Sequence, residues 1–152
     1  HQLRHGGCIL VMATPLTLRL PKFEALMARY GEGASPLPCP GLMELVEEGK
    51  LDGPEIEDYL HRLFAPYRDT PVDAVVLGCT HYVFLHSTLR RLLPAETAIL
   101  DGNAGAIRQL RRVLAERNAL RPEGASGRVE LHTSGDEALV LPRMKQLLYL
   151  PQ

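Results

Sequence analysis

The sequence is short of aromatic side chains and cysteine, and it has no long hydrophobic run. Its 152 residues contain no Trp, and aromatic residues make up 5% of the chain, which argues against a surface on which nucleobases stack. The formal net charge is −1, so nothing favours general binding to nucleic acid or to an anionic membrane. No stretch approaches the roughly 20 apolar residues of a membrane-spanning helix. We therefore expect a cytoplasmic protein without a membrane or nucleic-acid partner.

The three cysteines, Cys8, Cys39 and Cys79, are an odd number and lie far apart. This is a poor disulfide framework and fits a reducing compartment. The chain has no C-x-x-C pair, and its six histidines lack the spacing of metal ligands, so no metal site is predicted. There is also no initiator Met, and His1 lies close to a strand-like run. We therefore expect this chain to be a piece of a longer protein.

Apolar runs alternate with amphipathic stretches along the chain. Residues 8–13, 72–77 and 97–100 form short apolar runs, typical of strands buried in a parallel sheet. Helical periodicity or helix-end signals predict the helices between and after them. The ranges expected to be helical are 21–30, 42–49, 53–68, 82–93 and 104–120, with a further helix opened by a Ser-x-x-Glu capping box at 134–137 and interrupted or restarted at Pro142.

Two further segments complete the predicted α/β fold, a parallel sheet flanked by helices. The Pro-rich range 35–41 predicts a short edge strand or an extended loop. The range 128–132 alternates between apolar and polar residues and predicts a strand.

Polar residues that suit a binding or catalytic site follow three of the expected strands. Thr14 and Thr17 follow the first, Cys79 to His81 follow the second, and Asp101 follows the third. Parallel sheets bind ligands beyond the carboxyl ends of their strands, so we expect the functional site at this edge.

Cys79 lies between Gly78 and a Thr-His pair, at the expected start of a helix. Free N–H groups at a helix N-terminus favour an anion, and such a position can activate a thiol. His81 is placed to relay a proton to that thiol. The competing interpretation is that Cys79 is a buried, small apolar residue. By contrast, we expect Cys8, inside a strand, and Cys39, between prolines, to be structural.

Five ordered segments then resemble those of one family across nearly the whole chain. The segments are VMATPLT (11–17), CPGLMELVEEG (39–49), VVLGCTHY (75–82), ILDGNAGAI (99–107) and HTSGD (132–136). They resemble the glutamate racemases of the cofactor-independent Asp/Glu racemase superfamily. The resemblance implies two α/β lobes with the active site between them, a cysteine from each lobe, and no cofactor.

The resemblance also implies roles for individual residues. Cys79 would be the second-lobe base that removes the α-proton of L-glutamate, with His81 assisting the transfer. Thr80 would help to bind glutamate, Thr14 and Thr17 would line the site, and Glu47 would lie near it as a substrate-binding group.

Residues 1–103 would form the second lobe, and residues 104–152 would return to pack on the first. The first-lobe cysteine segment has no counterpart here, which implies an inactive fragment that associates with a missing first lobe or forms a homo-oligomer.

Two other functions stay open. Val83 stands where the family usually has Pro, and Leu20 where it often has Ser. These departures leave the identity of the substrate open, so the first alternative is an aspartate racemase or another isomerase of the superfamily. A non-catalytic binding fragment is the second alternative. Some members of the family are reported to bind DNA gyrase, and the arginines of 108–117 give weak support to a partner of that kind. The leading prediction is a glutamate racemase portion that supplies D-glutamate for bacterial peptidoglycan.

Overall fold

The computed structural model describes residue 2 and residues 5–150, and it divides into two compact units. The first unit ends at Asp101, and the second begins at Gly102. The predicted lobe ranges, 1–103 and 104–152, remain a prediction, and residues 1, 3–4 and 151–152 of those ranges lie outside the described residues. None of the helices in the described part of the chain combines the length and the apolar character that a membrane span requires.

A four-stranded parallel sheet forms the centre of the first unit, in the order β2-β1-β3-β4. The strands are β1 (Cys8–Ala13), β2 (Ala34–Pro38), β3 (Val72–Leu77) and β4 (Ala98–Leu100). The predicted α/β fold and its three apolar strands are confirmed. The Pro-rich segment forms the edge strand β2, where a missing backbone N–H is tolerated because one side of the strand has no neighbour.

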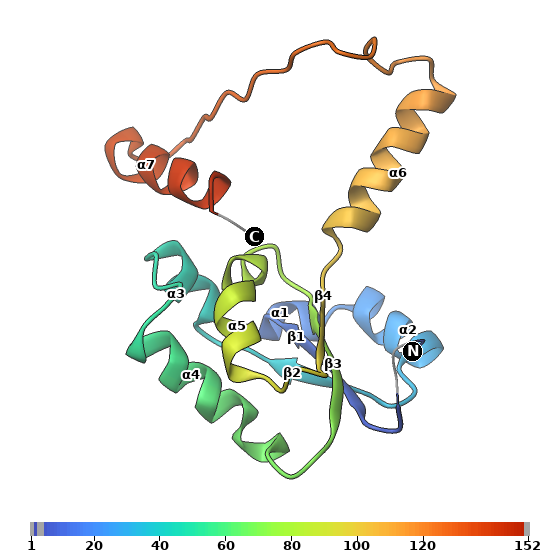
Figure 1. Cartoon of the computed structure of the whole chain (residues 1–152), viewed down its shortest axis with the longest axis vertical. Helices are drawn as coiled ribbons and strands as arrows, with labels where there is room; N and C mark the ends of the chain where they lie inside the picture. The colour runs from blue at the N-terminus through green and yellow to red at the C-terminus, as the bar shows by residue number, and fades with distance from the viewer. Residues whose placement is uncertain (1, 3–4, 151–152) are drawn as a thin grey trace. The chain divides into compact units, whose positions relative to one another are not determined.

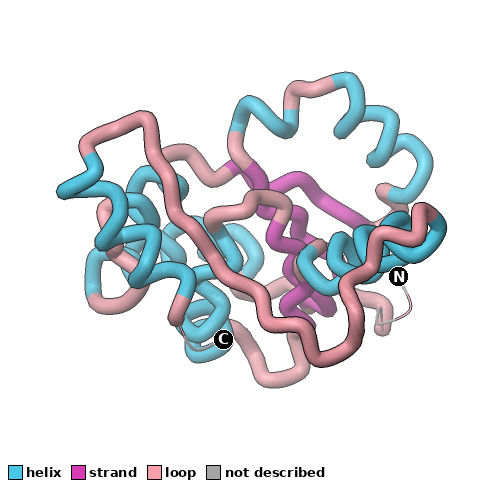
Figure 2. Tube along the Cα trace, turned by 90° about the horizontal axis from the view of Figure 1, so that it is seen from above, coloured by secondary structure: helices cyan, strands magenta, loops and turns pink. Residues whose placement is uncertain are grey.

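Helices cover both faces of this sheet, with α3, α4 and α5 on one side and α2 on the other (Figures 1 and 2). The elements of the first unit are α1 (Pro15–Leu18), α2 (Pro21–Tyr30), α3 (Leu42–Glu47), α4 (Pro54–Phe64), the 3₁₀ helices η1 (Ala65–Tyr67) and η2 (Tyr82–Leu85), and α5 (His86–Leu92). The core lies on the three-helix side. There Leu10 and Met12 of β1 pack with side chains such as Leu42, Ile56 and Leu89, all fully buried.

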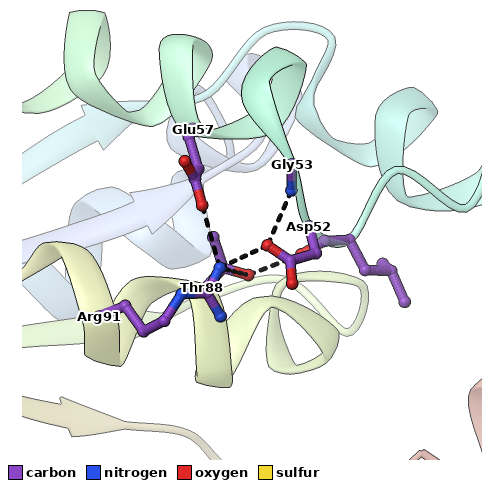
Figure 3. Close-up of polar contacts among 6 residues, drawn as sticks. Asp52, Gly53, Glu57, Thr88 and Arg91 are labelled. Atoms are coloured by element: carbon purple, nitrogen blue, oxygen red, sulfur yellow. Dashed lines mark hydrogen bonds and ion pairs between the residues drawn. The ribbon is translucent and has the colours of Figure 1, made fainter.

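Polar contacts tie the segment between α3 and α4 to α5 (Figure 3). The hydroxyl of Thr88, a buried residue, donates to the Leu51 carbonyl at 2.7 Å. One turn further along α5, the Arg91 guanidinium pairs with Asp52 and, at 3.0 Å, with Glu57. The loop between α3 and α4 and the start of α4 are therefore linked to the helix that follows the Cys79 segment.

The second unit contains two helices, α6 (Asn103–Glu116) and α7 (Glu137–Leu148). The predicted strand at 128–132 is wrong, because these residues form a loop that pairs with no strand in the described part of the chain. The predicted capping box names the wrong N-cap residue for α7. Asp136, not Ser134, caps α7 by accepting from the Ala138 N–H at 2.8 Å. Pro142 lies inside α7, and the helix continues through it.

Candidate active site

The carboxyl ends of β1 and β3 meet at one edge of the sheet. Met12 pairs with Leu77 in the parallel register, and the Gly78 N–H donates to the Met12 carbonyl at 2.8 Å. Residues that follow the two strands, Thr14 on one and Cys79 on the other, therefore lie at the same edge. The backbones approach so closely that a Cβ on Gly78 would lie 2.8 Å from the Met12 carbonyl oxygen. Glycine is thus required here by space and not by a positive φ.

Cys79 lies in a turn that leads into the 3₁₀ helix η2, and its side chain is half-buried. The Cys79 carbonyl accepts the Tyr82 N–H at 3.1 Å, an i to i+3 bond that tightens the chain. The predicted helix over 82–93 is therefore split, because the α-helix proper begins only at His86. A helix does start beside the thiol, at Tyr82, but as a four-residue 3₁₀ helix and not as the α-helix itself.

His81 lies between Cys79 and Glu47. The Cys79 Sγ is 3.8 Å from Nδ1 of His81, and Nε2 of the same ring is 3.2 Å from Oε1 of Glu47. The His81 side chain is 27% exposed and that of Glu47 is 60% exposed. Three groups from two elements thus form a continuous hydrogen-bonded chain, with one end at the half-buried thiol and the other open to solvent.

The carboxylate of Glu47 determines the tautomer of His81 in this chain. An ionised carboxylate only accepts hydrogen bonds, so Nε2 must carry the proton that joins the two side chains. In the neutral ring this leaves the lone pair of Nδ1 facing the Cys79 thiol. Nδ1 can then accept the thiol proton, and the nearby negative charge of Glu47 stabilises the imidazolium that forms. The arrangement offers a path for a proton between the thiol and the imidazole.

The predicted threonines lie at the same edge of the sheet, and the hydrogen bonds seen for Thr14 and Thr17 in the described structure join them to each other and not to Cys79. Thr14 caps the short helix α1. Its hydroxyl lies 2.9 Å from that of Thr17 and accepts the Thr17 N–H at 3.2 Å. Thr80, next to Cys79, is exposed. Substrate-binding roles for these three residues remain predictions, and so does direct substrate binding by Glu47, whose carboxylate is paired with His81.

The other two cysteines have different environments. Cys39 is 1% exposed, and its thiol donates to the Leu37 carbonyl at 3.2 Å. Burial raises the pKa of this thiol to about 12, so it is protonated at neutral pH. Cys8 is the first residue of β1 and therefore lies at the opposite end of the parallel strands from Cys79. Both positions agree with structural roles.

Two tyrosines near these residues were not indicated as functional by any sequence pattern. The Tyr82 hydroxyl donates to the Cys39 carbonyl at 3.3 Å, and the Tyr59 hydroxyl donates to the Pro40 carbonyl at 2.9 Å. Tyr82 directly follows His81, so its place in the sequence was a usable signal. Its partner lies 43 residues away, and no local pattern indicates that bond.

Within residue 2 and residues 5–150, no group of three or more His, Cys, Asp and Glu side chains is arranged to hold a metal ion. Cys79, His81 and Glu47 are groups that can exchange protons, and they lie at the ligand-binding edge of an α/β sheet.

Comparison with known proteins identifies the relatives of this chain. No family model matches. A glutamate racemase of Clostridium botulinum (strain 657 / Type Ba4) is 43% identical over 138 residues, which is 90% of this chain and 54% of the relative. One of Clostridium perfringens (strain 13 / Type A) is 38% identical over 149 residues, covering 97% and 57%. The crystal structure of Escherichia coli glutamate racemase with L-glutamate and the activator UDP-MurNAc-Ala matches with a TM-score of 0.74 at 25% identity, covering 96% and 57%.

The chain is thus related to the glutamate racemases in sequence and in fold. It spans about half the length of the curated relatives that it matches.

Proposed function

We propose that this chain supplies one of the two thiol acid–base groups of a glutamate racemase. The observation that carries the proposal is the hydrogen-bonded chain from Glu47 through His81 to Cys79. Its support comes from the related racemases, one of whose structures contains L-glutamate. In this proposal the enzyme acts in the cytoplasm of a bacterium, needs no cofactor, and provides D-glutamate for peptidoglycan.

The proposed reaction begins when His81 accepts the proton of Cys79. The resulting thiolate removes the α-proton of L-glutamate and becomes a thiol again, and the electron pair of the broken C–H bond is delocalised into the substrate carboxylate. A second thiol, from a first lobe outside these residues, then donates its proton to the opposite face of the α-carbon. The reverse reaction exchanges the two roles, so each group must work both as acid and as base.

An amino-acid α-proton is very weakly acidic, so the site must stabilise the negative charge that develops on the substrate. Fixed hydrogen-bond donors in a site closed to water do this best. Thr80, Thr14 and Thr17 are the proposed donors on this side of the substrate, because they lie at the same edge as Cys79. A first lobe closing over that edge would exclude water and bring the second thiol.

The second unit is proposed to pack on that first lobe. Helix α6 exposes 65% of Ile107 and 59% of Leu110, and α7 exposes 73% of Leu139. Apolar side chains at this exposure favour burial against a partner surface. A first lobe would cover them, and self-association of this chain is the alternative way to do so.

The test is exchange of the α-proton of L- and D-glutamate in D₂O, followed by NMR. The chain is assayed alone and with the first half of a full-length relative, with aspartate as the competing substrate. We expect exchange of glutamate only when both pieces are present. Cys79→Ala should abolish it, and Cys8→Ala, the matched control at the far end of the strands, should not.

Two outcomes would count against the proposal. Substantial exchange by the Cys79→Ala assembly would refute the role of this thiol. Exchange of aspartate instead of glutamate would assign the chain to another isomerase of the superfamily.

A further inference from the structure

We propose that Tyr82 is a positioning residue, whose hydroxyl fixes the turn that carries Cys79 and His81 against the turn that leads to Glu47. This inference rests on the proposed function for its catalytic meaning. The geometry that supports it is independent of any substrate.

Tyr82 is held at both its backbone and its side chain. Its N–H donates to the Cys79 carbonyl at 3.1 Å, and its ring is completely buried among core residues. The hydroxyl reaches across the core and donates to the Cys39 carbonyl at 3.3 Å. Tyr82 is also covalently joined to His81. The two bonds of Tyr82 therefore restrain the backbone beside the residue whose imidazole contacts the thiol.

The acceptor of this bond lies at the start of the helix that carries Glu47. The Cys39 carbonyl also accepts the Leu42 N–H at 3.5 Å, which closes the turn at the first residue of α3. Gly41 in that turn has a φ of 78°, a left-handed conformation that glycine adopts without strain. Helix α3 has only six residues, and Glu47 is the last of them. The position of the turn thus sets the position of the carboxylate.

A buried phenol suits this task because it stays a donor over a wide pH range. Burial, together with the nearby Cys39 and Cys79 thiols, raises the pKa of Tyr82 well above its usual value. Phenylalanine would fill almost the same volume and leave the Cys39 carbonyl without this donor. The bond links two turns 43 residues apart, and together these turns carry the two ends of the Glu47–His81–Cys79 chain.

The test compares Tyr82→Phe with Tyr59→Phe in the full chain. Tyr59 is the matched control, because its hydroxyl donates at 2.9 Å to the next carbonyl of the same turn, that of Pro40, but it comes from α4 and is not joined to the Cys79 turn. Two quantities are measured for each variant. They are the melting temperature and the rate at which iodoacetamide alkylates Cys79 between pH 6 and 9, resolved from Cys8 and Cys39 by peptide mass spectrometry.

We expect Tyr82→Phe to slow alkylation of Cys79 at neutral pH roughly three- to tenfold, the fold-change that corresponds to one hydrogen bond. Its pH–rate profile should move to higher pH. Tyr59→Phe should stay within about twofold of the unmodified chain, with a comparable loss of melting temperature. A Tyr82→Phe profile that matches the unmodified chain would overturn the proposal, and so would an equal change in both variants.

If the Tyr82→Phe variant does not fold, a second measurement on the unmodified chain tests the same proposal. In the unmodified chain, hydrogen–deuterium exchange of the Tyr82 and Leu42 amides should report one common opening event, since the hydroxyl couples the two turns. Independent opening of these two amides would overturn the coupling. Neither readout requires a substrate, so a negative racemisation assay with a positive thiol result would reject the proposed function and leave the role of Tyr82 in place.

Discussion

Oε1 of Glu47 lies 3.2 Å from Nε2 of His81, across 34 residues of sequence. The pair joins the last residue of α3 to the residue just before η2. The opposite nitrogen of the same ring faces the Cys79 thiol. This contact makes the carboxylate a partner of the histidine and connects it, through the imidazole, to the thiol.

Glu47→Gln should slow α-proton exchange by the assembled enzyme about tenfold, the difference between a charge-assisted and a neutral hydrogen bond. The amide oxygen can still accept from His81, but it no longer stabilises an imidazolium. Alkylation of Cys79 in the isolated chain should slow in parallel. The matched control is Glu48→Gln, one residue along, whose carboxylate pairs with Lys50. Equal activity of the two variants would remove Glu47 from the proton path.

Thr88→Val should destabilise the first unit by about 0.5–1.5 kcal/mol, because the part-buried Leu51 carbonyl loses its donor. Arg91→Ala should have a much smaller effect, because exposed ion pairs contribute little. Urea unfolding of both variants measures the difference. High salt should reduce the effect of Arg91→Ala and leave that of Thr88→Val almost unchanged. A larger loss for Arg91→Ala would mean that the ion pairs in Figure 3 dominate this contact.

Local sequence patterns predicted the sheet but not the contacts across it. Apolar runs such as Cys8–Ala13 indicate burial directly, and the order of strands and helices implies parallel pairing. The Glu47–His81 contact and the Tyr82 hydroxyl bond depend on how α3 and η2 pack, which no local periodicity encodes. The resemblance indicated that Glu47 lies near the site. It did not indicate that its carboxylate pairs with the histidine.

The failed strand at 128–132 shows the limit of alternation as a signal. Val129 and Leu131 do share one side of the chain, and both line a hollow with Leu141 and Leu148 of α7. The two apolar residues of the alternating pattern thus line one hollow without forming a strand. A strand also needs a neighbour for its backbone hydrogen bonds, and sequence alternation does not supply one.

Gly78→Ala should destabilise the first unit by about 1–3 kcal/mol, because the new Cβ overlaps the Met12 carbonyl oxygen, a backbone atom that cannot easily move. Since Gly78 precedes Cys79, thiol alkylation should change as well. The contrasting substitution is Gly105→Ala inside α6, where the Cβ meets only the end of the Arg108 side chain at 3.9 Å. That change should stabilise the helix by about 1 kcal/mol. A neutral Gly78→Ala would mean that β1 and β3 can separate at this edge without cost.

The buried Cys39 thiol should make the first unit less stable in alkaline solution. Its folded pKa of about 12 lies above the unfolded value of 9.0, so its contribution is complete below pH 9 and is lost as the pH rises toward 12. The free energy of unfolding should fall by roughly 1.4 kcal/mol per pH unit within that window. Tyr59 adds to the loss from about pH 10, because burial raises its pKa to about 12.

Urea unfolding at pH 8, 9 and 10 isolates the cysteine contribution, since the tyrosines begin to contribute only at the upper end of this range. Cys39→Ala should be less stable at pH 8, because it leaves a small cavity in the core. It should also lose most of the slope between pH 9 and 10. Cys8→Ala is the control and should keep that slope. An unchanged slope in Cys39→Ala would show that other groups, and not the buried thiol, cause the alkaline loss of stability.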